Sequence, residues 1–278
     1  MDALTLQIVE LVLIGLCAGF LGGLLGIGGS IIMIPALTEV LGPDQHLYQA
    51  AAMIVNFCVV VPALVQHRRA KAIHGGVVRR TIPTAMAAIL IGVGLSELPQ
   101  FSGAGEAYLM GLFGVFLLCE GSYDLHRMFR GGSERDALAM ADAGIDQRAT
   151  WRNCACIALP TGLIGGLFGV GGGTISVPLQ RRVLHMPVRS AIANSAAIML
   201  FTSLPGALMK NIAFAAEHGS MNKPFMLAAI LAPTAIIGSF NGSRLTHRLP
   251  VRTVKIAFFA VLCLVALRLI HRAYGILS

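Results

Sequence analysis

Charged residues are scarce in this sequence, and their scarcity excludes a soluble protein. They make up 12% of the 278 residues, whereas a soluble domain carries about 25%. Hydrophobic residues account for 56%, and the mean hydropathy is +0.76. Apolar runs of about 20 residues, long enough to cross roughly 30 Å of hydrocarbon, recur from end to end. Because backbone groups in that layer must pair within their own segment, these runs predict membrane-spanning helices, and the alternating pattern of a membrane barrel is absent.

Several signatures of enzymes and cofactor sites are also missing. The six cysteines form no CxxC pair and the eight histidines show no paired ligand spacing, so we expect no metal site. The glycine-rich segment at 23–28 is followed by Gly29 where a phosphate loop requires lysine, and it lacks the dinucleotide-binding pattern. The net charge of +8 arises in short loops and does not indicate a nucleic-acid partner. We therefore expect neither enzymatic activity nor a cofactor.

The most informative feature that is present is a glycine-rich stretch used twice. Residues 19–37 read GFLGGLLGIGGSIIMIPAL, and residues 162–180 read GLIGGLFGVGGGTISVPLQ. The two copies align without a gap at an offset of 143 residues, which indicates internal duplication. The chain therefore divides into a membrane repeat at 1–125, a linker at 126–152 and a second membrane repeat at 153–278. Within the linker, the segment DALAMADAG is compatible with a short surface helix.

Each repeat contains five apolar runs, and the glycine-rich stretch joins the first two. The runs lie at about 4–26, 28–42, 49–66, 78–98 and 106–125, and then at about 153–169, 171–185, 190–210, 224–243 and 253–272. The second run of each repeat has only about fifteen residues, and at 1.5 Å per residue such a helix falls short of a full crossing. We predict a break or tight bend at each glycine stretch, with a re-entrant hairpin as one form of it. The first run has acidic residues before it and no cleavage site, so we expect a retained helix rather than a signal peptide.

Basic residues assign the two sides of the membrane. They gather in four loops, at 67–80, 126–152, 181–189 and 244–252. The positive-inside rule places these loops in the cytoplasm and both termini outside. Arg268 and Arg272, near the C-terminus, disagree with this assignment.

The number of crossings predicts that the second repeat is inserted upside down. A hairpin returns the chain to its own side, and three further spans then leave each repeat on the opposite side. Inverted repeats with broken helices recur in secondary transporters, where the substrate lies near the midplane between the repeats. Duplication in a purely structural membrane scaffold is the alternative.

The doubled G-x-x-G-G-x-x-G-x-G-G stretch, with a proline six residues after it, resembles the sulfite exporter TauE/SafE family. The small-residue segment at 190–197, its continuation at 202–207 and the basic loop after the third apolar run are similar as well. The resemblance implies a multi-pass transporter in the bacterial inner membrane that carries a small anion, typically a sulfur oxyanion or a sulfonate. One departure is that Asn194 and Ser195 correspond to two alanines in the first repeat, so this polar pair occurs only once.

The glycine bends are the expected substrate site. Bending frees backbone N–H groups, and a helix that starts after the bend directs its N-terminal amides toward a cavity, which suits an anion. Polar side chains inside apolar runs would complete the site. The candidates are Gly26, Gly28, Gly29, Ser30, Asn56, Gly169, Gly171, Gly172, Gly173, Thr174, Asn194, Ser195, Thr202 and Ser203. Glu10 and Glu120, carboxylates in or near apolar runs, are candidates for a coupling proton.

Other interpretations of the same residues stay open. Gly22 with Gly26, and Gly165 with Gly169, form small-xxx-small faces that let membrane helices pack closely without binding a substrate. Polar residues such as Asn56 bridge helices as readily as they contact a ligand. A passive anion channel would use the same residues without coupling to an ion gradient. A membrane scaffold or enzyme would bind no anion at the bends.

Overall fold

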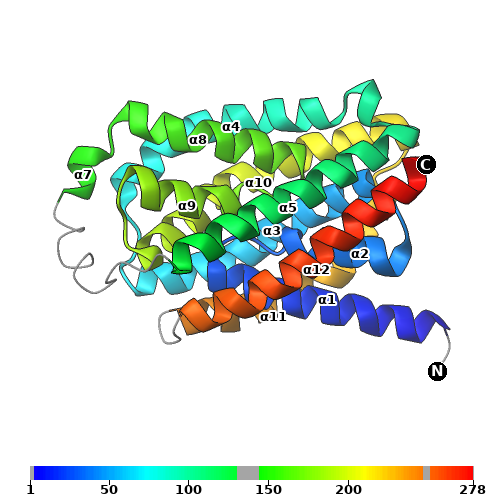
Figure 1. The fold of residues 1–278 in the computed structure, drawn as a ribbon, viewed down its shortest axis with the longest axis horizontal. Coiled ribbons are helices and arrows are strands. Elements are labelled where there is room, and N and C mark those ends of the chain that lie inside the picture. The colour runs from blue at the N-terminus through cyan, green and yellow to red at the C-terminus, as the bar shows by residue number, and fades with distance from the viewer. Residues whose placement is uncertain (1–2, 130–143, 247–250, 278) are drawn as a thin grey trace.

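The computed structural model describes residues 3–129, 144–246 and 251–277, and within these ranges the chain is helical and contains no strand. The helices form an elongated bundle (Figure 1). The first repeat contains α1 (Ala3–Leu25), α2 (Ser30–Leu41), α3 (Gln45–Arg69), α4 (Gly75–Ser96), the short 3-10 turns η1 (Pro99–Phe101) and η2 (Gly103–Gly105), and α5 (Glu106–Phe129). After α7 (Ile145–Arg148), the second repeat contains α8 (Trp151–Leu167), α9 (Gly173–Val183), α10 (Val188–His218), α11 (Asn222–Thr246) and α12 (Val251–Leu277). The prediction of an all-α fold is confirmed, and the helices follow the expected apolar runs.

Both glycine stretches break the chain between two helices, as expected. Glycines in the breaks adopt positive φ values, namely +67° at Gly26, +78° at Gly28, +70° at Gly169, +70° at Gly171 and +84° at Gly172. Glycine reaches this region without the steric penalty of a side chain. The helices that follow, α2 and α9, have 12 and 11 residues. They rise only about 17–18 Å, well short of a hydrocarbon layer of about 30 Å.

Each broken pair is a tight hairpin because its arms touch through glycine. A Cβ atom at Gly22 would lie 2.6 Å from the carbonyl carbon of Gly28. A Cβ atom at Gly165 would lie 2.4 Å from the amide nitrogen of Gly172. Real side chains do not approach backbone so closely, so the small-xxx-small pattern has a packing role in this fold.

The two repeats pack against each other in a symmetric way. α1 packs along α11 and α8 packs along α4, so the first helix of each repeat lies against the fourth helix of the other. The third helices, α3 and α10, pack together between them, and α5 pairs with α12. The principal contacts between the repeats therefore occur in equivalent pairs.

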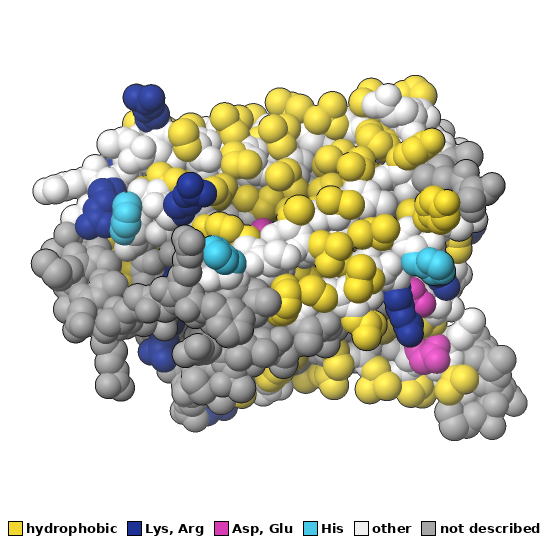
Figure 2. Space-filling model, in the orientation of Figure 1, with side chains coloured by type: hydrophobic (Ala, Val, Ile, Leu, Met, Phe, Trp, Pro, Cys, Tyr) yellow, Lys and Arg dark blue, Asp and Glu magenta, His cyan; other side chains and the backbone are white. Residues whose placement is uncertain are grey.

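The outside of the bundle is apolar. Figure 2 shows hydrophobic side chains across the middle of the visible face, with basic side chains gathered toward the end that carries α7. Large apolar side chains such as Ile91, Leu208 and Ile237 are more than half exposed. Among the described residues, five helices are long and apolar enough to cross a membrane, namely α1, α3, α4, α10 and α11. The chain is therefore a multi-pass membrane protein.

The start of the first repeat and the end of the second lie at the same end of the bundle, and two arginines of α12 lie near this end of the chain. The start of α1 and the end of α12 lie at one end, and α7 lies at the other (Figure 1). Arg268 and Arg272 of α12, which disagree with the charge pattern of the loops, form ion pairs with Glu39 of α2 at 3.6 and 3.8 Å. Arg272 also donates to the carbonyl of Thr38. The Glu39 carboxylate thus compensates part of the positive charge of these two arginines. The surface helix expected in the linker falls outside the described residues.

Candidate functional site

The two glycine breaks meet where α3 packs against α10. Gly26 lies against Ile192 of α10, and Gly169 lies against Gln49 of α3. These contacts are equivalent at the offset of 143 residues that relates the repeats. A Cβ atom at Gly173 would lie 2.8 Å from the carbonyl oxygen of Ile27, so the breaks also touch each other. The structure therefore brings the glycine stretches, which are far apart in sequence, to one buried place between the repeats.

Asn56 of α3 caps the helix that follows the first break. Its Oδ1 accepts hydrogen bonds from the amides of Gly29 at 3.0 Å and Ser30 at 3.2 Å. Its Nδ2 donates to the Ser30 hydroxyl at 2.9 Å. The N-terminal amides of α2, expected to contact a substrate, are therefore occupied by a side chain of the protein itself. In this arrangement the amides of Gly29 and Ser30 are already hydrogen-bonded and do not need a substrate as a partner.

The second break lacks such a cap. Met199 of α10 is the equivalent of Asn56, and its sulfur would lie 2.7 Å from a Cβ at Gly173. A thioether sulfur is only a weak hydrogen-bond acceptor. Among the described residues, the N–H groups of Gly172, Gly173 and Thr174 have no hydrogen-bond partner. The start of α9 therefore presents free donors at the positions equivalent to Gly29 and Ser30, whose amides are paired with Asn56 in the first break.

Hydroxyl groups of α10 line both breaks. Ser195 Oγ lies 3.0 Å from the carbonyl oxygen of Gly26 and 3.1 Å from that of Gly173, so it links the two breaks. Thr202 Oγ1 lies 3.2 Å from the carbonyl oxygen of Gly171. Ser203 is fully buried, and its Oγ has no hydrogen-bond partner in the described part of the chain. A Cβ at Gly171 would lie 3.2 Å from this oxygen, which places an unpaired hydroxyl beside the second break.

Three further candidates are placed differently. The Oδ1 of Asn194 accepts from the amide of His74 at 2.8 Å, before the start of α4, so this side chain connects helices rather than lining the breaks. Glu120 of α5 lines a pocket that also contains Ile27 and Thr174, so it lies within reach of both breaks. Glu10 is partly exposed on α1, about four turns before Gly26, and is not brought to the site.

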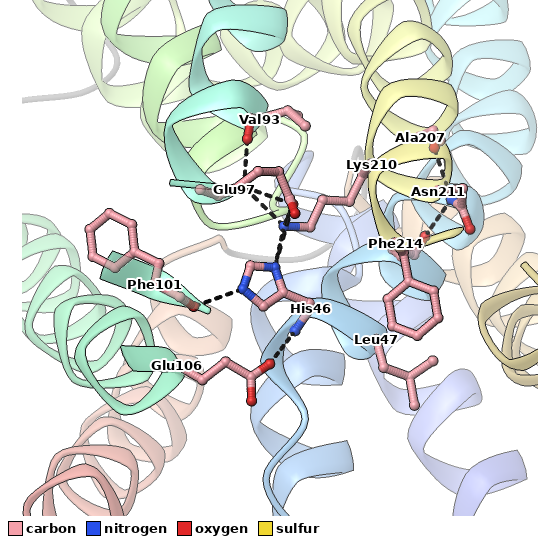
Figure 3. Close-up of polar contacts among 12 residues, drawn as sticks. His46, Leu47, Val93, Glu97, Phe101, Glu106, Ala207, Lys210, Asn211 and Phe214 are labelled. Atoms are coloured by element: carbon pink, nitrogen blue, oxygen red, sulfur yellow. Dashed lines mark hydrogen bonds and ion pairs between the residues drawn. The ribbon is translucent and has the colours of Figure 1, made fainter. Parts of the chain in front are cut away.

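Figure 3 shows a buried ion cluster that sequence reasoning did not identify. Lys210 of α10 is fully buried, and its Nζ lies 2.5 Å from Glu97 Oε1, 2.9 Å from Ser96 Oγ and 2.9 Å from His46 Nδ1. The His46 ring also contacts the carbonyl oxygen of Phe101 at 2.9 Å. The backbone amide of His46 donates to Glu106 Oε1 at 3.1 Å. One cation of the second repeat is thus held by residues of the first.

Glu97 follows the last residue of α4 and is ionised in this arrangement. Burial by itself would raise the pKa of Glu97. The contact with His46 and the positive charge of Lys210 outweigh that effect and lower the pKa of Glu97 from 4.5 to about 2. The carboxylate therefore keeps its charge, and its pairing with Lys210, across the physiological pH range.

One sequence signal could have revealed this cluster. Lys210 is the last residue of the apolar run at 190–210. A lysine there needs a partner, because a buried charge is expensive unless it is paired. Its partners, His46 and Glu97, lie between or at the ends of the predicted apolar runs and are more than 110 residues away along the chain. Only the packing of α10 against α3 and α4 brings them together.

Comparison with known proteins identifies related chains over almost the whole length. The family model described as Sulfite exporter TauE/SafE matches residues 11–269. The probable membrane transporter protein MamO of Magnetospirillum gryphiswaldense is 27% identical over 290 residues, which cover 95% of this chain and 45% of that protein. The probable membrane transporter protein MJ0441 of Methanocaldococcus jannaschii is 26% identical, with 91% of each chain covered. YunE of Bacillus subtilis, also named a probable membrane transporter protein, is 25% identical over 98% of this chain and 100% of its own length.

The relatives differ in length from this chain. It spans less than half the length of the MamO proteins, whereas MJ0441 and YunE are matched over nearly their full lengths. No solved structure matches the chain.

Proposed function

The chain belongs to the sulfite exporter TauE/SafE family, and from this premise we propose that it is a secondary transporter of a small anion in the bacterial inner membrane. The substrate class that we propose is a sulfur oxyanion or an organosulfonate, in keeping with the name of the family. The family and the named relatives are membrane transporters rather than enzymes. Since nothing in the sequence resembles an ATP-binding module, the driving force in this proposal is an ion gradient or the gradient of the anion itself.

One observation carries the proposal, namely the unpaired donors at the second break. The amides of Gly172, Gly173 and Thr174 lie at the start of α9, and the buried Ser203 hydroxyl lies beside Gly171. A helix N-terminus carries partial positive charge, and its free N–H groups bind oxyanions. The anion would accept from these amides and from Ser203, close to the Asn56 amide group. Asn56 occupies the matching donors of the first break, so we assign Gly26, Gly28, Gly29 and Ser30 a supporting role.

The inverted arrangement of the repeats is part of the same proposal. α1 starts at the end of the bundle opposite α7, whereas α8 starts next to α7, so the first helices of the two repeats run in opposite directions (Figure 1). Alternating access would come from one repeat rocking against the other about the α3 and α10 contact. Glu120, in the pocket that reaches Thr174, is our candidate for a coupling proton near the site.

Thiol labelling tests the orientation. We expect a cysteine at Ala70, in the exposed turn after α3, to react only with reagents that enter the cytoplasm. A cysteine at Gln100, exposed at the other end of the repeat, should react with a membrane-impermeant reagent added to whole cells. We expect this pattern because cytoplasmic loops carry an excess of Lys and Arg, and basic residues surround Ala70. The reverse labelling pattern would overturn the assigned orientation.

Ser203→Ala tests the anion site at the second break. Hydrogen bonds to charged groups contribute about 1.5–3 kcal/mol, so loss of this hydroxyl should raise the KM for sulfite by about tenfold to a hundredfold. No hydrogen bond within the described residues is lost, so folding should be unaffected. Ser243→Ala is the matched control, because that buried hydroxyl bonds only to carbonyls of its own helix. Flux measured in proteoliposomes with an unchanged KM for Ser203→Ala would remove Ser203 from the site.

A further inference from the structure

Buried polar residues lie on α3 and α10 both at the second break and around Lys210. On α10, Lys210 lies about two helical turns beyond Ser203 and therefore on the same face. Asn211, the residue after Lys210, donates to the carbonyl oxygen of Ala50 on the facing helix α3 at 3.2 Å. Gln49 lies on α3 between His46, which contacts Lys210, and Asn56, which lies at the breaks. We call these residues the polar seam; Met53 and Ala207, which belong to an apolar cluster, lie between its two ends.

Several side chains along this seam lack hydrogen-bond partners. In the described part of the chain, the buried polar atoms without a partner include both amide atoms of Gln45 and of Gln49, Ser203 Oγ and Asn211 Oδ1. Buried polar groups in folded proteins are normally paired, so each exception calls for an explanation. Gln49 and Ser203 lie beside the second break, and Gln45 and Asn211 are the chain neighbours of His46 and Lys210. A polar solute would therefore find unpaired hydrogen-bonding groups at both places.

Stability alone does not account for Lys210. Buried ion pairs can often be replaced by apolar residues of similar size without loss of stability. Lys210 is nevertheless fully buried, whereas the side chain of Glu97 is 19% exposed. Glu97 therefore lies between the ammonium group and the surface of the protein, and a pocket lined by Gln45 and Glu106 reaches the edge of the cluster. The arrangement is that of a cation whose counter-ion faces water.

We propose that Lys210 and Glu97 form a site that couples proton binding to anion binding, in which a proton taken up by Glu97 releases Lys210 to pair with the transported anion. This inference rests on the proposed transport of a small anion. In the closed arrangement Lys210 is neutralised by the Glu97 carboxylate. When a proton from the aqueous side binds a carboxylate oxygen of Glu97, that group becomes a neutral acid. The ammonium group keeps its three protons, and the anion replaces the carboxylate as its counter-ion.

Thermodynamic linkage makes the coupling reciprocal. If protonation of Glu97 favours the anion at Lys210, the anion at Lys210 favours protonation of Glu97 to the same extent. With Lys210 as its partner, Glu97 has a pKa of about 2. Once the anion has taken that partner, the acid loses the charge that kept its pKa low. The KM therefore rises with pH wherever one proton is taken up together with the anion.

Other charged groups surround the pair and need to be separated from it. His46 contacts both Lys210 and Glu97, and Glu106 accepts from the His46 amide. Glu217 acts electrostatically on Lys210 and on Glu106, and Asp44 acts on Glu106. Glu97→Gln leaves Glu106, Glu217 and Asp44 in place but also removes a charge that faces His46. His46→Gln is therefore measured beside it to separate the two groups.

The test is the pH dependence of the KM for sulfite, measured in proteoliposomes from about pH 5 to about pH 8. The titration of sulfite itself affects every variant alike, so the readout is the ratio of each KM to that of the wild type. Glu97→Gln mimics the protonated acid, and we expect it to lower the KM by at least about tenfold at the alkaline end and to abolish the added pH dependence. Lys210→Met should raise the KM at every pH and also lose that dependence.

The outcomes separate this inference from the proposed function. If the wild type shows no saturable sulfite flux, the proposed function fails. If the wild type transports sulfite and Glu97→Gln keeps both the KM and its pH dependence, only the coupling site is wrong. A dependence that is lost in His46→Gln but kept in Glu97→Gln would place the proton on the histidine and overturn the assignment. Glu97→Gln by itself tests whether Glu97 carries the coupling proton, even if Lys210→Met fails to fold.

Discussion

Gly171→Leu is expected to abolish anion flux while leaving the protein in the membrane. Gly171 has a φ of +70°, and a Cβ at this position would lie 3.2 Å from Ser203 Oγ and 3.3 Å from Asn56 Nδ2. A leucine would therefore fill the space between the second break and the two polar groups that we assign to the anion. The left-handed backbone adds a penalty of about 1–2 kcal/mol. Sulfite flux in proteoliposomes should fall to the level of empty vesicles.

The matched control for Gly171→Leu separates strain from obstruction. Gly219 has a similar φ of +73°, but a Cβ there would meet nothing within 4 Å. Gly219→Leu therefore introduces the same backbone strain in open space, and it should retain flux. Gly28→Leu, whose Cβ would lie 2.4 Å from Met199 Cε, should fail as Gly171→Leu does. Transport that survives both Gly28→Leu and Gly171→Leu would refute a site at the glycine breaks.

Asn56→Asp is expected to block transport and to lose less stability than Asn56→Leu. A carboxylate oxygen can accept from the amides of Gly29 and Ser30 as the asparagine does, and a negative charge is favourable at the start of a helix. The same charge would lie next to Gly171, where we propose that the anion binds. Two unit charges about 5 Å apart repel by about 3 kcal/mol at an effective dielectric constant of about 20. The KM for sulfite should rise by about a hundredfold.

Asn56→Leu provides the contrasting result. It removes the acceptor of two buried amides, at about 1–3 kcal/mol for each unpaired group, so its melting temperature should drop clearly below that of the wild type. Thermal unfolding in detergent measures this difference. If Asn56→Asp instead transports sulfite with the KM of the wild type, no anion binds beside Asn56, and the substrate site lies elsewhere.

The architecture was predictable because its signals are local or repeated. Apolar runs defined the helices, and the doubled glycine stretch defined the breaks, since the need for positive φ at Gly26 and Gly169 is encoded at those positions. The tight contact between the arms of each hairpin also follows from local glycine spacing. Membership of the transporter family was indicated by the same stretch.

The chemistry of the site was less predictable because it depends on contacts between distant segments. Asn56 was identified as a candidate contact, but its role as the cap of α2 depends on the packing of α3 against the first break. The difference between the breaks arises because Met199 takes the equivalent place, which neither glycine stretch reveals. Lys210 and Glu97 are separated by 113 residues and meet only in the folded bundle.

Labelled sulfite flux in proteoliposomes, with and without a pH gradient, tests the central claim most directly. The account predicts saturable uptake that follows the gradient and is inhibited by other small sulfur anions such as thiosulfate or a sulfonate. Saturable flux that ignores the gradient would point to a uniporter, and non-saturable flux to a channel. If folded, correctly inserted protein moves no sulfur anion under either condition, the account of this chain as a sulfur anion transporter is contradicted.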